Sequence, residues 1–154
     1  MDLSELLAPG NIFPALKATS KKQVFRELSE RAARVCNIEE RKIFDVLLER
    51  ERLGTTGIGN GIAIPHGRLE ALDRLQGFFA HTENPVDFDA VDGAPVNLIF
   101  LLLAPEGAGA DHLKALALVS RLLRDHAMCE KLRGARTAES LYALLTESAT
   151  PHAA

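Results

Sequence analysis

One segment of the chain, Gly57–Arg68, reads GIGNGIAIPHGR and combines three kinds of residue. Glycines at every second position let the backbone turn sharply and let a partner come close. The apolar run that follows, Ile62–Ile64, is typical of a short buried strand. Pro65 lacks the N–H that a strand ladder needs, so we expect the strand to end there with His66 at its mouth. A histidine in this cleared position, beside the cation Arg68, suits the acceptance of an anionic group.

The glycine triplet, Gly57, Gly59 and Gly61, matches neither of two familiar phosphate-binding motifs. A GxGxxG dinucleotide fingerprint needs glycine where this chain has Ile62, and the Gly-Lys-Ser/Thr end of a P-loop is absent. The glycines could serve a turn alone, but exposed N–H groups in such a segment can also bind phosphate oxygens. We favour a turn that is also a phosphate cradle, to which Gly67 contributes.

The composition is that of one globular domain. The chain has 154 residues, of which 47% are hydrophobic and 25% are charged, and this is enough to bury a core. We expect a single domain over residues 1–147 and a frayed tail over residues 148–154. The net charge of −3 and the lack of Trp disfavour nucleic-acid binding. With no signal-peptide pattern and no apolar run long enough to span a bilayer, we expect a cytoplasmic protein without membrane insertion.

Apolar periodicity predicts helices on both sides of a group of strands. Helices are expected at residues 20–36 with Ser20 as N-cap, at about 39–52, from His112 to about 125 with Asp111 as N-cap, at 128–132, and after Thr137. Strands are expected at residues 62–64, 76–82 and 96–103, and the last is apolar enough to be buried on both faces. At the N-terminus we expect a helical turn at residues 2–8, stopped by Pro9-Gly10, and an extended piece at 11–19. This order predicts an α/β fold, a mixed (parallel/antiparallel) central β-sheet flanked by helices.

The segment Thr56–His66 resembles the active-site signature of the phosphotransferase-system EIIA proteins of the mannitol/fructose type. Within that superfamily it most resembles the nitrogen-regulatory branch, EIIA-Ntr, and the resemblance runs from about Ser20 to Leu145. It implies the EIIA mannitol/fructose-type fold and a phosphoryl group carried by the histidine of the "IPH" motif, His66, as a tele-phosphohistidine. A lone histidine after a turn is usually an ordinary surface residue. The signature around His66 favours the phosphoacceptor, because a neutral imidazole is a nucleophile at physiological pH.

The resemblance also implies roles for His112 and Arg50. The block that begins at His112 resembles the family's second histidine block, whose histidine helps to hold the phosphoryl group. The free N–H groups of a helix N-terminus favour an anion there, although Asp111 opposes it; the alternative is a solvated residue in a first turn. Arg50 matches the arginine before the family's G-S/T-T-G turn and could bind phosphate oxygens bidentately, unless it belongs to a charged helix face. Arg68 is expected to steer the phosphoryl donor.

The remaining candidate metal ligands lack a supporting pattern. His81, His126 and His152 do not form a motif such as HExxH, and the two cysteines do not form CxxC. We therefore expect no metal and no cofactor.

The function that the resemblance implies is that of a phosphocarrier. His66 would accept a phosphoryl group from an NPr/HPr-like histidine phosphocarrier protein, as a phosphotransferase component and not as an enzyme with ordinary turnover. The protein would regulate partners such as potassium transporters or sensor kinases according to its phosphorylation state. No EIIB or EIIC domain fits in 154 residues, which favours the nitrogen-regulatory branch. Two alternatives stay open: a sugar-specific EIIA that passes phosphate to a separate EIIB, and a binding module that is never phosphorylated.

Overall fold

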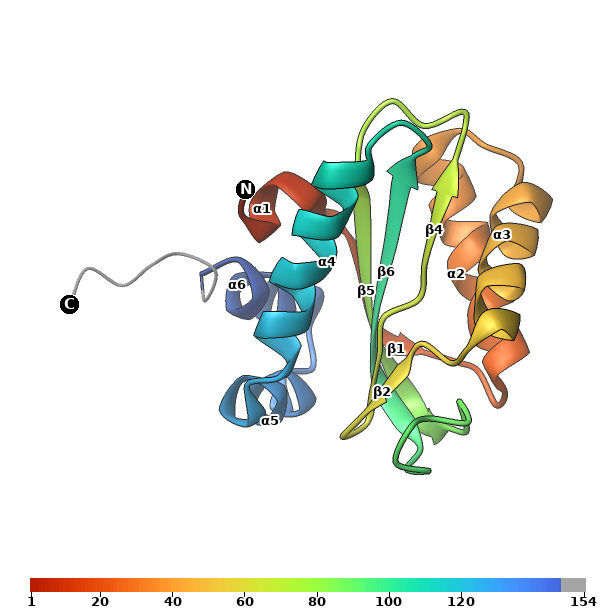
Figure 1. Ribbon diagram of the computed structural model, residues 1–154. Coiled ribbons are helices and arrows are strands. Elements are labelled where there is room, and N and C mark those ends of the chain that lie inside the picture. Colours follow the sequence, from red (N-terminus) through yellow and green to blue (C-terminus); the bar gives the residue numbers. More distant parts are fainter. Residues whose placement is uncertain (148–154) are drawn as a thin grey trace.

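A mixed β-sheet lies at the centre of the computed structural model, which describes residues 1–147 (Figure 1). Its strands run in the order β1-β5-β6-β3-β2, and β4 pairs with β6 further along that strand. Strand β6 is antiparallel to β5 and parallel to β3 and β4. The strands are β1 (Leu7–Leu16), β2 (Gly57–Gly59), β3 (Ile62–Ala63), β4 (His66–Leu69), β5 (Gln76–Val86) and β6 (Val96–Pro105). The predicted mixed sheet is thus confirmed.

Helices cover both faces of this sheet, as Figure 1 shows. One face carries α2 (Lys21–Cys36) and α3 (Glu40–Leu53), and the other carries α1 (Leu3–Leu6), α4 (Gly109–Leu123), α5 (His126–Gly134) and α6 (Ala138–Glu147). Side chains of β6 alternate between the two resulting cores, with Ile99 and Leu101 under α2 and α3, and Leu98 and Phe100 under the other helices. Strand β6 is therefore buried on both faces, as its apolar sequence predicts. Within residues 1–147, no helix is both long and apolar enough to cross a membrane.

The N-terminal segment differs from the prediction. Helix α1 ends at Leu6, and Pro9 and Gly10 lie inside β1 instead of stopping a helix. The extended piece expected at 11–19 covers the second half of this strand, which ends at Leu16. A proline is tolerated because β1 is at the edge of the sheet, where one side of the strand has no ladder to break. A register shift between Leu7 and Ile12 accommodates the two residues.

Three predicted helix boundaries are confirmed by their hydrogen bonds or backbone angles. The Ser20 hydroxyl accepts a bond of 3.1 Å from the Gln23 N–H, and that of Thr137 accepts one of 3.1 Å from the Ser140 N–H. Asn37 ends α2 in the left-handed conformation, with φ of 54°. Asparagine tolerates this conformation better than most residues, so the polar break in the sequence marks the boundary correctly.

The prediction for Asp111 is wrong. Helix α4 begins three residues earlier than predicted, at Gly109, and its N-cap is Ala108, whose side chain cannot accept a capping bond. Asp111 therefore lies in the first turn, and His112 is the fourth helical residue with its N–H bonded to the Ala108 carbonyl at 2.8 Å. Because no capping side chain marks this start, the sequence offers only the later Asp as a signal.

The segment after the glycines contains two short strands, β3 in the apolar run and β4 after Pro65, where one strand was expected. Strand β3 pairs with β6 at Leu98 and Ile99, and β4 resumes the same parallel pairing with His66 opposite Leu102. Pro65 lies in the gap, where its carbonyl accepts a bond of 3.0 Å from the Leu102 N–H. His66 therefore begins a strand instead of lying beyond the end of one, and its backbone is fixed against the central strand.

Candidate functional site

An open cleft of about 540 Å³ brings together five of the predicted site residues. Arg50 comes from the last turn of α3, Gly67 lies between His66 and Arg68 in β4, and His112 comes from the first turn of α4. The cleft is completed by residues that are mostly apolar, namely Val46, Glu49, Leu53, Leu113 and Leu116. Three segments that are far apart in the sequence thus meet at one surface.

The two ring nitrogens of His66 have different partners. Nδ1 lies 2.9 Å from the Ile64 carbonyl oxygen. Because a carbonyl can only accept, Nδ1 carries the proton and Nε2 has the lone pair. Arg50 donates its Nε–H to that lone pair over 3.3 Å. The structure therefore marks Nε2 as the nucleophilic atom of this imidazole.

Burial keeps the His66 imidazole neutral. It is the largest influence on the pKa of His66 and lowers it from the ordinary value. The bond to the Ile64 carbonyl raises the pKa, the charge of Arg50 lowers it further, and the charge of Glu51 raises it slightly. With the pKa below about 6.5, the ring is unprotonated at Nε2 at neutral pH.

The ring of His112 lies next to that of His66. Their centroids are 5.7 Å apart and their planes meet at 67°, an edge-to-face arrangement. Arg68 donates from Nε to Nδ1 of His112 over 3.2 Å, while Nε2 is buried and has no partner among the described residues. Burial first, and then the charges of His66 and Arg68, lower the pKa of His112. His112 is thus a neutral ring that offers one N–H.

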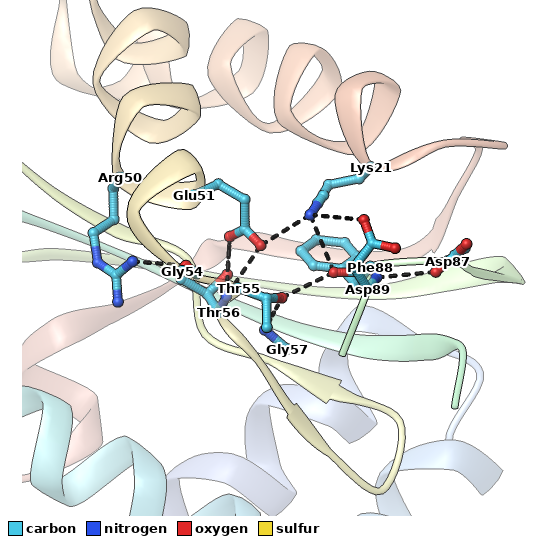
Figure 2. A network of polar contacts seen from close by, with 10 residues as sticks. All are labelled: Lys21, Arg50, Glu51, Gly54, Thr55, Thr56, Gly57, Asp87, Phe88 and Asp89. Carbon is cyan, nitrogen blue, oxygen red and sulfur yellow. Dashed lines mark hydrogen bonds and ion pairs between the residues drawn. The ribbon is translucent and has the colours of Figure 1, made fainter. Parts of the chain in front are cut away.

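A polar network fixes the turn behind Arg50 (Figure 2). Arg50 donates from Nη1 to the Gly54 carbonyl at 2.8 Å. The buried carboxylate of Glu51 accepts bonds from Thr56, one of 3.1 Å from the N–H and one of 2.6 Å from the hydroxyl. Lys21 at the start of α2 completes the network with an ion pair of 3.1 Å to Glu51. These bonds limit the movement of the turn, and so the guanidinium group of Arg50 is held in a fixed position.

Sequence reasoning missed Glu51 and Lys21, although one signal was present. Glu51 follows Ile43 and Leu47 at four-residue intervals, and all three are buried on the same side of α3. A carboxylate on the apolar stripe of a helix needs a partner, because an unpaired buried charge is very costly. The alternating charges of residues 49–52 instead suggested a solvated helix face.

The glycine triplet lies outside the cleft. Gly59 and Gly61 have positive φ angles of 103° and 79°, which the hairpin between β2 and β3 requires. The Gly61 carbonyl accepts from the Leu98 N–H, four residues before the partner of His66 on β6, or about 13 Å along a strand. Gly57 pairs with Ala63 in the hairpin, so of the four glycines only Gly67 lines the cleft.

Gly67 has a packing role of its own. A Cβ atom at this position would lie 2.5 Å from Cγ1 of Val46, which is closer than real Cβ contacts come. The absence of a side chain therefore lets α3 pack directly on β4, and this contact sets the distance between Arg50 and His66. Within residues 1–147, no group of three His, Cys, Asp or Glu side chains could hold a metal ion. His152 lies outside the described residues.

A protein-family model described as "Phosphoenolpyruvate-dependent sugar phosphotransferase system, EIIA 2" matches residues 5–148. The chain belongs to this EIIA family. The EIIA chain is 54% identical over 145 residues to the nitrogen regulatory protein of Bradyrhizobium diazoefficiens, covering 94% of the chain and 95% of that relative. The family assignment made from the signature is confirmed.

Solved structures of the EIIA family have the same fold. Nitrogen regulatory protein IIA-Ntr from Neisseria meningitidis matches with a TM-score of 0.89 and 38% identity, covering 94% of this chain and 99% of that one. IIA mannitol from Escherichia coli matches with a TM-score of 0.75 and 25% identity, covering 90% and 98%. This EIIA chain is thus more similar to the nitrogen-regulatory structure than to the mannitol structure.

Proposed function

We propose that this EIIA domain is a phosphocarrier of a nitrogen-regulatory phosphotransferase system and accepts a phosphoryl group on Nε2 of His66. The observation that supports it most is the bond between Nδ1 of His66 and the Ile64 carbonyl, which leaves the lone pair, and so the nucleophile, at Nε2. The names of the relatives support the regulatory branch.

The transfer step follows from the tautomer of His66. The Nε2 lone pair attacks the phosphorus of a phosphohistidine on the donor protein and forms a new N–P bond. The donor's N–P bond breaks, and its electron pair returns to the donor imidazole. Nδ1 keeps its proton, so the His66 ring becomes a cation that the Ile64 carbonyl stabilises. The phosphoryl group on this ring is then easily passed on.

Arg50 and His112 stabilise the charge on the transferring group. Arg50 gives up its bond to Nε2 as the phosphorus approaches and directs its N–H groups to the phosphoryl oxygens. His112 offers its Nε2–H to another oxygen. Fixed donors of this kind act through electrostatic stabilisation, which is the main contribution in phosphoryl transfer. The phosphate contacts are thus assigned to these side chains and to the backbone around Gly67, without the hairpin glycines.

The rim of the cleft suits a protein donor. Leu53 is 84% exposed and Leu113 is 65% exposed, and they line the cleft from α3 and α4 respectively. Exposed leucines beside a reactive group are typical of a docking surface. A small NPr/HPr-like phosphocarrier in the cytoplasm is the donor that we propose, and the exposed cation Arg68 can steer it.

The same surface can report the phosphorylation state. A phosphoryl group adds nearly two negative charges next to the exposed leucines. A regulatory partner with an apolar or acidic contact, such as a potassium transporter or a sensor kinase, then meets desolvation cost and repulsion. We expect such a partner to bind the unphosphorylated form more tightly, and His66→Asp, which carries a negative charge, to bind like the phosphorylated form.

The test uses labelled phosphoenolpyruvate, the general phosphotransfer proteins and intact-mass measurement. One phosphate on the wild type and none on His66→Ala would support the proposal, and no phosphate on the wild type would favour a binding module. The family description and the mannitol structure support a second candidate, a sugar-specific EIIA. Rapid passage of the phosphate from His66 to a separate EIIB protein would favour that candidate over the regulatory one.

A further inference from the structure

We infer that Arg68 is a positioning residue that fixes the tautomer of His112 and so keeps its Nε2–H for the phosphoryl group. This inference rests on the proposed phosphocarrier function and goes beyond donor steering, the role that the sequence suggested for Arg68. It concerns a residue that acts through a neighbouring ring.

The chemistry of the bond between the two side chains determines the tautomer. The Nε of an arginine can only donate, so the atom that accepts from it, Nδ1 of His112, must have a lone pair. A neutral imidazole has a single N–H, and in His112 that N–H must then be at Nε2. Arg68 lies two residues after His66 on β4, so both side chains leave the strand on the same face, towards the start of α4.

The Nε2 atom of His112 has no acceptor in the part of the chain that the structure describes. The residue is 5% exposed, and Nε2 is buried without a hydrogen-bond partner among the described residues. Buried donors without partners are rare, because they lose their bonds to water and gain nothing. The adjacent ring is that of His66, with its centroid 5.7 Å away. A phosphoryl oxygen on His66 is the acceptor that this donor lacks.

The two histidines are thus prepared in complementary states. A carbonyl holds the proton of His66 at Nδ1 and leaves a lone pair at Nε2, whereas an arginine holds a lone pair of His112 at Nδ1 and leaves a proton at Nε2. One ring can attack the phosphorus and the other can donate to its oxygens. Without Arg68, His112 would exchange between its two tautomers and offer the donor only part of the time.

The first test observes the tautomer without any phosphoryl transfer. Nitrogen-15 NMR of the histidine rings, at a pH where both are neutral, should show an unprotonated Nδ1 and a protonated Nε2 for His112. In Arg68→Met the two signals should move towards each other as the tautomers exchange. Arg52→Met is the matched control, because it removes an exposed arginine from the end of α3 that does not line the cleft, and it should change neither signal.

Two NMR results would overturn the inference. One is a wild-type His112 with the proton at Nδ1, which needs no variant to be observed. The other is an unchanged tautomer in Arg68→Met, and Arg68→Leu, which also lacks a donor, can replace that variant if the methionine form does not fold.

The second test separates tautomer control from simple charge. In His112→Gln the side-chain amide supplies an N–H that does not depend on Arg68. We expect Arg68→Met to slow phosphorylation roughly tenfold in the wild-type background, below the roughly hundredfold to thousandfold effect of deleting a whole donor. In the His112→Gln background the same change should slow it less, because only the contribution of Arg68 to steering remains. Equal slowing in both backgrounds would mean that Arg68 acts by charge alone, and would overturn the inference. A wild type that takes up no phosphate would instead contradict the proposed function and leave the NMR result intact.

Discussion

The two ends of the Gly57–Arg68 segment face different parts of the molecule. At the first end, Gly59 and Gly61 form a tight hairpin whose neighbours are Asp92 and Arg133. At the second end, His66 lies in the cleft with Arg50, about 13 Å away along β6. A continuous sequence signature thus contains one part that shapes the chain and another that carries reactive groups. Closeness in sequence does not place both parts in one site.

Removal of the nucleophile should have the largest effect at the histidine end. His66→Ala should fold and take up no phosphate, because no other ring in the cleft presents a lone pair at Nε2. Intact-mass measurement after incubation with the donor system checks this, and circular dichroism checks the fold. Full phosphorylation of the alanine variant, or phosphate mapped to His112 in the wild type, would require the two histidines to exchange roles.

Loss of a supporting donor should have the next largest effect. Arg50→Ala and His112→Ala should each slow phosphorylation by roughly a hundredfold to a thousandfold, equivalent to about 2.7–4 kcal/mol, with His66 still the modified residue. Rapid-quench kinetics with a labelled donor measures the rates. Arg52→Met, which removes a charge outside the cleft, is the control. Rates equal to that of the wild type would exclude these two residues from the transfer step.

A substitution in the hairpin should lower the stability of the fold and leave the rate of phosphorylation nearly unchanged. Gly61→Ala forces a side chain into a φ of 79° and places its Cβ 2.7 Å from Nη2 of Arg133. We expect about 1–3 kcal/mol lower stability in urea unfolding, from backbone strain and overpacking, and a phosphorylation rate within about twofold of the wild type.

Gly93→Ala provides the matched control for this glycine. Gly93 also has a positive φ, of 74°, but an added Cβ would meet nothing within 4 Å. Its substitution should cost only the backbone strain, so the difference between the two variants isolates the crowding at Arg133 and Asn97. If Gly61→Ala folds but is phosphorylated more than about tenfold more slowly, the result would instead support the prediction that the glycines bind the phosphate.

The smallest expected effect is a dependence of stability on pH, which is caused by the two histidines of the cleft. Burial lowers the pKa of both His66 and His112 in the folded state, while their unfolded values are about 6.5. Below that pH the unfolded chain binds more protons than the folded one, so stability is full above about pH 6.5 and falls as the pH decreases towards the folded pKa values.

Urea midpoints at about pH 7.5 and 5.5 measure this dependence. The midpoint should be lower at the acidic pH, and the decrease should be smaller in the double variant His66→Ala, His112→Ala. His81, whose pKa burial also lowers, stays in that variant and retains part of the effect. A decrease of the same size in the double variant would show that the cleft histidines are not its source.

The parts of the structure that sequence predicted well have local causes. The apolar run of β6 and the caps at Ser20 and Thr137 depend on residues within a few positions of each other. The first half of strand β1 was missed because its strand character comes from pairing with β5, about seventy positions away, and Pro9-Gly10 masks it locally. The start of α4 was missed because Ala108 provides no cap signal.

The site shows the same division between local and distant causes. The signature and the resemblance named Arg50, His66 and His112, and the structure brings all three into one cleft. Burial of the Glu51 carboxylate depends on Lys21, thirty residues earlier, and the bond from Arg68 to His112 joins residues 44 positions apart. Side-chain pairs at such distances leave no periodic pattern in the sequence, so only the folded chain reveals them.

The bond that orients His66 ends on a main-chain oxygen, that of Ile64. Every amino acid at position 64 would supply the same oxygen, so no point mutation there can delete the acceptor, and only a different path of the chain could. The tautomer of His66 is therefore determined by the path of the main chain. The state of His112 depends on the side chain of Arg68, which a single codon change can remove. Evolution can thus adjust the second histidine in one step while the first remains constant.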